Sequence, residues 1–100
     1  MMTKIELFNA KNCGQKLEAG TIIEVKAVGS FNDKDKDGNA VVASALVATD
    51  GTVYTAISAS IADSLDLLDE ILSEEGTVKV RAIESKSASG RTFKMLEIVE

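Results

Sequence analysis

Hydrophobic and polar residues alternate in several short segments of this chain, which is the pattern of strands that bury one face. Proline is absent, so glycines and short Asn, Asp and Ser clusters separate the alternating segments. Residues 41–49 are apolar on both faces, so we expect either a strand at 3–8 or a second subunit to cover the far face. Gly29 predicts a bulge or kink near the end of its strand. The pattern predicts six strands, at residues 3–8, 21–31, 41–49, 52–56, 77–85 and 91–99.

The apolar spacing becomes helical after the fourth of these strands. Four apolar residues recur at intervals of four, three and four and would share one helix face: Ile61, Leu65, Leu68 and Leu72. They predict a helix over residues 58–73 or 60–73. Ser60 with Asp63 suits its N-terminal cap, and Gly76 suits the position just past its end.

The order of elements indicates a fold class. Three main strands, a helix and two more strands (βββαββ) make up the element order of the five-stranded oligonucleotide-binding (OB) barrel. We therefore expect one domain over residues 1–100, mainly β with one helix, OB-like, with an additional short N-terminal strand at 3–8. In OB barrels the second and third strands and their flanking loops bind single-stranded nucleic acid.

The composition argues against catalytic and metal-binding functions. The 100 residues are 45% hydrophobic with a net charge of -5, which is typical of a folded globular protein. Histidine is absent, which removes the usual general base and metal ligand, and Cys13 has no partner for a disulfide or a thiol nucleophile. We expect no catalytic activity, no cofactor and no metal. A free thiol and the absence of a signal peptide or long apolar run predict a cytoplasmic protein that does not enter a membrane.

Acidic and basic residues are segregated along the chain. Residues 63–75 hold six acids and no base, whereas the remainder holds ten acids and eleven bases. Residues 77–94 hold five bases against Glu84 alone. An acidic protein can therefore still present a basic strip to a polyanion.

The candidate binding residues are aromatic or basic. Tyr54 alternates with Val53, Thr55 and Ile57, and Ile57 leads into the apolar helix stripe, so Tyr54 is expected to face away from the helix and stack on bases. Phe31 or Phe93 would assist it. Tyr54→Ala is then expected to cost ~1 to 3 kcal/mol of binding with the fold intact. The expected phosphate contacts are Lys26, Lys34, Lys36, Lys79, Arg81, Lys86 and Arg91.

The last two strands place several of these residues together. If both strands alternate as expected, Lys79 and Arg81 project to the same side as Arg91 and Phe93. A basic patch beside an aromatic ring suits a sequence-tolerant single-strand binder. A solvated hairpin face without a ligand would carry the same charges.

A second motif resembles the start of a calcium loop. Residues 33–38 read D-x-D-x-D-G, but loop position twelve, which needs a bidentate glutamate, is Ser44, and strands flank the segment. The segment is better explained as a solvated turn. Lys34 and Lys36 at its tip would then contact phosphates.

The chain resembles the small single-stranded DNA-binding proteins of phi29-like phages. The resemblance begins at Phe8-Asn9-Ala10, continues through residues 20–24, is densest over residues 50–58 and closes with Val78-Lys79-Val80 and the strand carrying Phe93. It implies coating of displaced single strands during protein-primed replication in the host cytoplasm, with phage replication proteins as further partners. By motif, only Tyr54 corresponds to the tyrosines of the family's binding surface. The chain departs from the family in being shorter, with few aromatics and no run of glycines near Gly14.

The acidic helix suggests an alternative function. Leu67 lies off the apolar stripe by about a third of a turn, so it is either half-buried or a contact for a partner. With the acidic face around it, this helix could dock on a basic protein. Charge reversal of Asp66 and Glu70 would then abolish function, whereas Tyr54→Ala would not.

Overall fold

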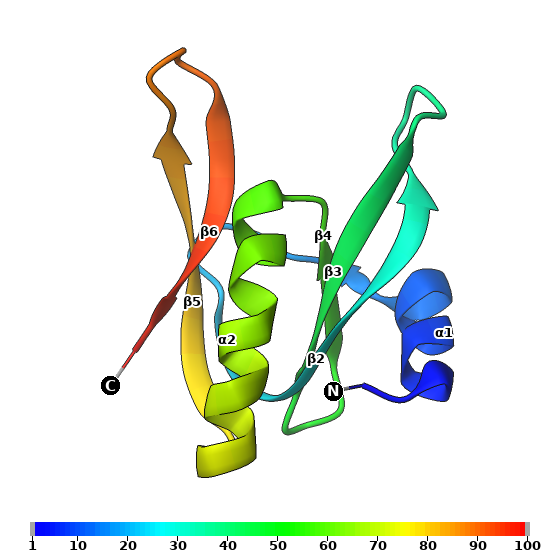
Figure 1. Cartoon of the computed structure of the whole chain (residues 1–100), viewed down its shortest axis with the longest axis vertical. Helices are drawn as coiled ribbons and strands as arrows, with labels where there is room; N and C mark the ends of the chain where they lie inside the picture. The colour runs from blue at the N-terminus through cyan, green and yellow to red at the C-terminus, as the bar shows by residue number, and fades with distance from the viewer. Residues whose placement is uncertain (1, 100) are drawn as a thin grey trace.

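Six strands form one sheet that curls partway around a helix in the computed structural model, which describes residues 2–99 (Figure 1). The strand order across the sheet is β1-β4-β3-β2-β5-β6, and only the β1–β4 pair is parallel. The protein is therefore mixed α/β, with a half-barrel sheet and two helices. The elements along the chain are α1 (Lys4–Cys13), β1 (Gln15–Lys16), β2 (Ile22–Lys34), β3 (Ala40–Ala48), β4 (Val53–Ala56), α2 (Ala59–Glu75), β5 (Val78–Lys86) and β6 (Thr92–Ile98).

The five main strands and the long helix are confirmed, but the predicted N-terminal strand is wrong. Residues 3–8 belong instead to α1, whose first turn is closed by a capping box. The Glu6 backbone N–H donates to Thr3 Oγ1 at 3.1 Å, and the Thr3 N–H donates to Glu6 Oε1 at 3.0 Å. The Thr-x-x-Glu signature was present in the sequence, and it predicts a helix start better than a six-residue alternation predicts a strand.

Helix α1 covers the outer face of β3. Its Leu7 and Ala10 pack with Met2 against Ala45 and Val47. Strand β3 is apolar on both faces because α1 buries its outer face and α2 buries its inner face, so both faces are covered within one chain.

Gly29 serves this packing and does not mark a bulge. The register of β2 shifts between Val25 and Ala27, several residues earlier than predicted. A Cβ on Gly29 would lie 2.9 Å from Leu7 Cδ2, which is closer than a side-chain contact tolerates. Glycine here lets α1 approach the sheet.

Helix α2 fills the inside of the curl. Figure 1 shows it between the β2–β3 and β5–β6 hairpins, which both extend past its N-terminal end. Its four predicted stripe residues are buried in the main core with Leu46 and Val80. Gly76 ends the helix with a φ of 83°, as predicted, but the N-cap is Ser58 and not Ser60.

Candidate nucleic-acid interface

Two adjoining clefts form a groove where β4 passes into α2. The first cleft, about 780 Å³, lies between the start of α2 and the β5–β6 hairpin. The second, about 430 Å³, runs from there toward β1 and the β2–β3 hairpin. Ile57 and Lys94 line both, so we treat the two as one surface, called the groove below.

Ser58 holds the floor of the groove in place. Its hydroxyl donates to the Lys94 carbonyl at 2.6 Å and accepts from the Ile61 N–H at 3.4 Å. One side chain therefore caps α2 and ties the β4–α2 junction to β6, across the open side of the sheet. The groove also meets the N-terminal end of α2, where Ala59 and Ser60 line it and the helix dipole is positive.

The ionised side chains of the groove are weakly basic overall. Lys16, Arg91 and Lys94 face Asp33 and Glu84, which gives a net charge of +1 before the helix dipole is counted. The six acids of α2 do not line either cleft. The formal charge of the groove lining is thus opposite in sign to the net charge of the whole protein, which is -5.

Phe93 is the aromatic residue that lines the groove. It is half-buried on β6 and lines the larger cleft with Arg91 and Lys94. Ile57, 55% exposed, adds an apolar surface beside it. Base stacking on an aromatic ring combined with phosphate contacts is the usual chemistry of single-strand binding.

The predicted orientation of Tyr54 is wrong. Its ring is half-buried and packs against the core that α2 covers, and it is paired across the sheet with Leu46. The prediction failed because Ile57 does not continue the strand: β4 ends at Ala56, so alternation could not be extended to the helix. Contact of Tyr54 with DNA stays a prediction.

Phe31 and Tyr54 lie on opposite faces of the sheet. Phe31 packs against the smaller core under α1, opposite Ala43 in the β2–β3 register. The structure therefore does not bring these two rings together. Phe8 is 69% exposed on α1 and lies outside both cores.

Of the four predicted basic residues near the hairpin tips, Arg91 lines the groove. Lys34, Lys36 and Lys86 do not line it, and we call these three the rim residues. Lys34 and Lys36 flank the tip of the β2–β3 hairpin, and Lys86 and Arg91 flank the tip of the β5–β6 hairpin. Figure 1 shows both tips extending in the same direction, past the start of α2.

The β2–β3 tip is shaped by Asp35. Its carboxylate accepts from the backbone N–H groups of Asp37 and Asn39, both at 2.9 Å. The Asn39 hydrogen bond holds the pKa of Asp35 below its ordinary value. This carboxylate organises the turn, and no group of metal-binding side chains is found within residues 2–99.

The remaining predicted bases lie outside the groove. The β5–β6 register puts Arg81 on the same face as Phe93, as predicted, but about 13 Å away along the strand. Arg81 forms an ion pair with Glu97 on the neighbouring strand, so its positive charge is partly neutralised within the protein. Lys79 lies beyond Arg81, and Lys26 is exposed at the register shift of β2.

Sequence reasoning missed three residues of the groove. Lys16 lies on the two-residue strand β1, Lys94 on β6 and Ile57 in the β4–α2 connection. These residues are far apart in the sequence, and only the curl of the sheet brings them together. Lys94 was the one basic residue of the 77–94 segment not proposed as a contact, and the local charge excess was the available signal.

Within residues 2–99, neither helix is long and apolar enough to cross a membrane.

Comparison with known proteins identifies the family. No solved structure matches the chain significantly. The single-stranded DNA-binding protein of Bacillus phage phi29 is 31% identical over 104 residues, covering 95% of this chain and 84% of the relative, and that of Bacillus phage PZA matches equally. A sequence model of the family described as phage single-stranded DNA-binding protein matches residues 1–99, so the chain belongs to this family of non-enzymatic binding proteins.

Proposed function

We propose that this protein coats displaced single strands during phage DNA replication and binds them, without sequence preference, in the groove between its two hairpins. The family and the relatives' names support binding of single-stranded DNA. The observation that carries the choice of surface is Phe93, which lines a cleft with Arg91 and Lys94 beside the positive end of α2.

The proposed path of the strand follows from the shape of the groove. Bases stack on Phe93 and pack on Ile57, while Arg91 and Lys94 contact the flanking phosphates. The rim residues Lys34, Lys36 and Lys86 contact phosphates further along. Stacking and phosphate contacts do not depend on the identity of the base, so we expect no sequence preference.

We also propose that the sheet is an OB-type barrel left open between β4 and β6. Three features support this assignment. The long strand β2 pairs with both β3 and β5, and α2 joins β4 to β5. The Ser58–Lys94 hydrogen bond spans the gap where a strand pair would close a barrel.

The test is fluorescence anisotropy with a labelled oligo-dT at two salt concentrations. Wild-type protein is expected to bind more tightly at the lower salt, because cation release favours binding. On an oligo-dT that holds one protein, Phe93→Ala should weaken binding, whereas Phe8→Ala, which removes an exposed phenylalanine on α1, should leave it unchanged. Absence of wild-type binding at low salt contradicts the function, and equal affinities for Phe93→Ala and wild type contradict the site.

A further inference from the structure

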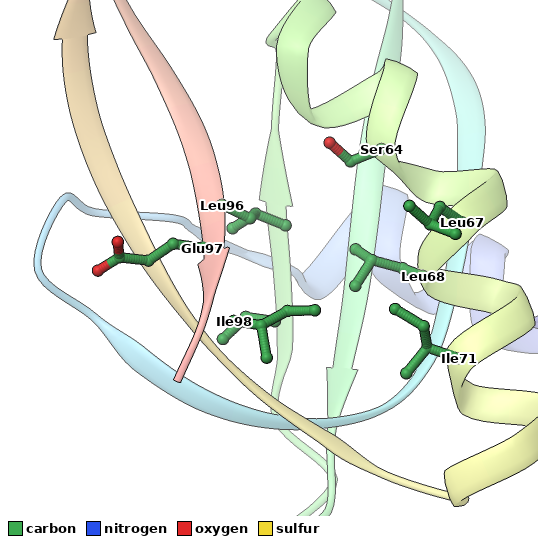
Figure 2. A pocket seen from close by; sticks show the side chains of 8 residues that line it. Ser64, Leu67, Leu68, Ile71, Leu96, Glu97 and Ile98 are labelled. Carbon is green, nitrogen blue, oxygen red and sulfur yellow. The ribbon is translucent and has the colours of Figure 1, made fainter. Parts of the chain in front are cut away.

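A second, apolar groove lies between α2 and the β5–β6 side of the sheet. It has a volume of about 280 Å³ and separates α2 from the edge strand β6. Figure 2 shows Leu67, Leu68 and Ile71 of α2 pointing toward Leu96 and Ile98 of β6. Leu67 is 62% exposed and Ile98 51% exposed, so the groove presents apolar surface to solvent.

Helix α1 presents the converse shape, an apolar ridge. Its Leu7 and Ala10 are used in packing against the sheet. Its outer face carries Ile5 and Phe8, which are 75% and 69% exposed. Two large apolar residues one helical turn apart on a solvent-facing helix are typical of a helix that docks into a groove.

The charges around the two apolar surfaces are complementary. Phe8 has Lys4 four residues before it and Lys11 three residues after it, so a lysine stands on each side. Leu67 has acids at the same two positions, Asp63 and Glu70. Within residues 2–99 none of these four charged side chains forms an ion pair.

The two surfaces cannot meet within one molecule. Helix α1 packs on the outer face of β2 and β4, whereas α2 packs on the inner face (Figure 1). A contact between them must therefore join two copies through different surfaces. Such a head-to-tail contact leaves one free surface at each end and can be repeated along a line.

We propose that α1 of one copy docks on the α2–β6 groove of the next copy, so that neighbouring molecules on a DNA strand contact one another head to tail. In an antiparallel arrangement of the two helices, Phe8 meets Leu67, Ile5 lies along Ile71, and each lysine faces an acid. This proposal rests on the proposed function in one respect, because bound single-stranded DNA is what brings the copies into line. It gives the acidic helix face a partner, which is the basic α1 of an identical chain.

A charge exchange between two variants tests the contact. Lys4→Glu with Lys11→Glu makes both surfaces acidic, and Asp63→Lys with Glu70→Lys makes both basic, so each variant repels itself. In an equimolar mixture, every contact between the two different variants again joins opposite charges. The measured quantity is the ratio of affinity for poly-dT, per site, to affinity for an oligo-dT that holds one protein.

Wild type is expected to show a ratio of about ten, within the usual range of coupling between sites. Each variant alone should fall toward one, and the mixture should recover most of the wild-type ratio. A mixture no better than its components overturns the proposal, as does a wild-type ratio of one. Retention of the wild-type ratio by both variants also overturns it, and is the result expected if a different protein fills the groove.

Two further arms separate this proposal from the proposed function. If the wild type does not bind the short oligo-dT, the proposed function fails, and sedimentation of the free protein at high concentration then decides the docking with the same mixture. Leu67→Ser should lower the ratio without a change of charge, whereas Ile22→Ser, an exposed apolar residue on β2, should not. Circular dichroism establishes that each variant is folded, and equal ratios for these two variants overturn the proposal.

Discussion

Two half-buried aromatic residues of this protein, Tyr54 on β4 and Phe93 on β6, have different surroundings. Tyr54 packs against the core beneath α2 and is paired with Leu46. Phe93 lines an open cleft with Arg91 and Lys94. Similar exposure therefore does not indicate a similar role. An aromatic ring suits base stacking when cations lie beside it, and suits the fold when aliphatic side chains do.

The largest expected effect is on Tyr54, and it concerns stability. Tyr54→Ala leaves a space against the core, so the free energy of unfolding should fall by about 2 kcal/mol, somewhat less than for a fully buried ring. Chemical denaturation measures this loss. The affinity of the folded variant for oligo-dT should fall less than that of Phe93→Ala. Unchanged stability together with a large loss of affinity would reverse the roles of the two residues.

The next effect is on Phe93, and it concerns binding. Phe93→Ala removes the ring that stacks in the groove, so binding to oligo-dT should weaken by ~1 to 3 kcal/mol, as for other stacking residues. Its midpoint of chemical denaturation should stay closer to wild type than that of Tyr54→Ala. Isothermal titration with a fixed oligo-dT length provides the affinity.

A smaller effect distinguishes a groove lysine from a paired arginine. Lys94→Ala should reduce the slope of log affinity against log salt by ~0.7, the value for one phosphate contact on a single strand. Arg81→Ala should leave the slope unchanged, because Arg81 is paired with Glu97 outside the groove. If Lys94→Ala and Arg81→Ala reduced the salt slope equally, the binding surface would extend along β5 to Arg81. The two residues would then not differ in their contact with DNA.

The smallest effect concerns the turn that precedes β4. The Thr52 N–H donates to Asp50 Oδ1 at 2.9 Å, and this bond holds the pKa of Asp50 below its ordinary value of 3.8. A lowered folded-state pKa stabilises the protein above pH 3.8, and the contribution is lost as pH falls from there through the folded-state pKa. The difference in thermal midpoint between wild type and Asp50→Ala should therefore shrink on acidification below pH 3.8. DNA affinity at neutral pH should not change, because Asp50 does not line the groove.

Much of the fold could be predicted because its signals are local. The alternation of β2 and β5, the continuous apolar run of β3 and the four-residue stripe of α2 each lie within one segment. The error at α1 came from a short segment in which two periods fit equally well. The capping residues Thr3 and Glu6 would have decided between them.

The groove could be predicted only in part. Phe93 and Arg91 are close in sequence to each other, so their joint position followed from one strand. Lys16 and Ile57 reach the same surface through the curl of the sheet, and that curl depends on strand pairing between distant segments. The face of Tyr54 depended on where β4 ends, and one residue of difference reverses the assignment.

The central claim is that single-stranded DNA binds in the groove lined by Phe93. The most direct test is one titration series at low salt with a labelled oligo-dT that holds one protein, comparing wild type, Phe93→Ala and Phe8→Ala. The groove predicts an affinity loss of about tenfold or more for Phe93→Ala, from the loss of one stacking contact, and none for Phe8→Ala. Wild-type affinity in Phe93→Ala would contradict the assignment and place the DNA on another surface of this protein.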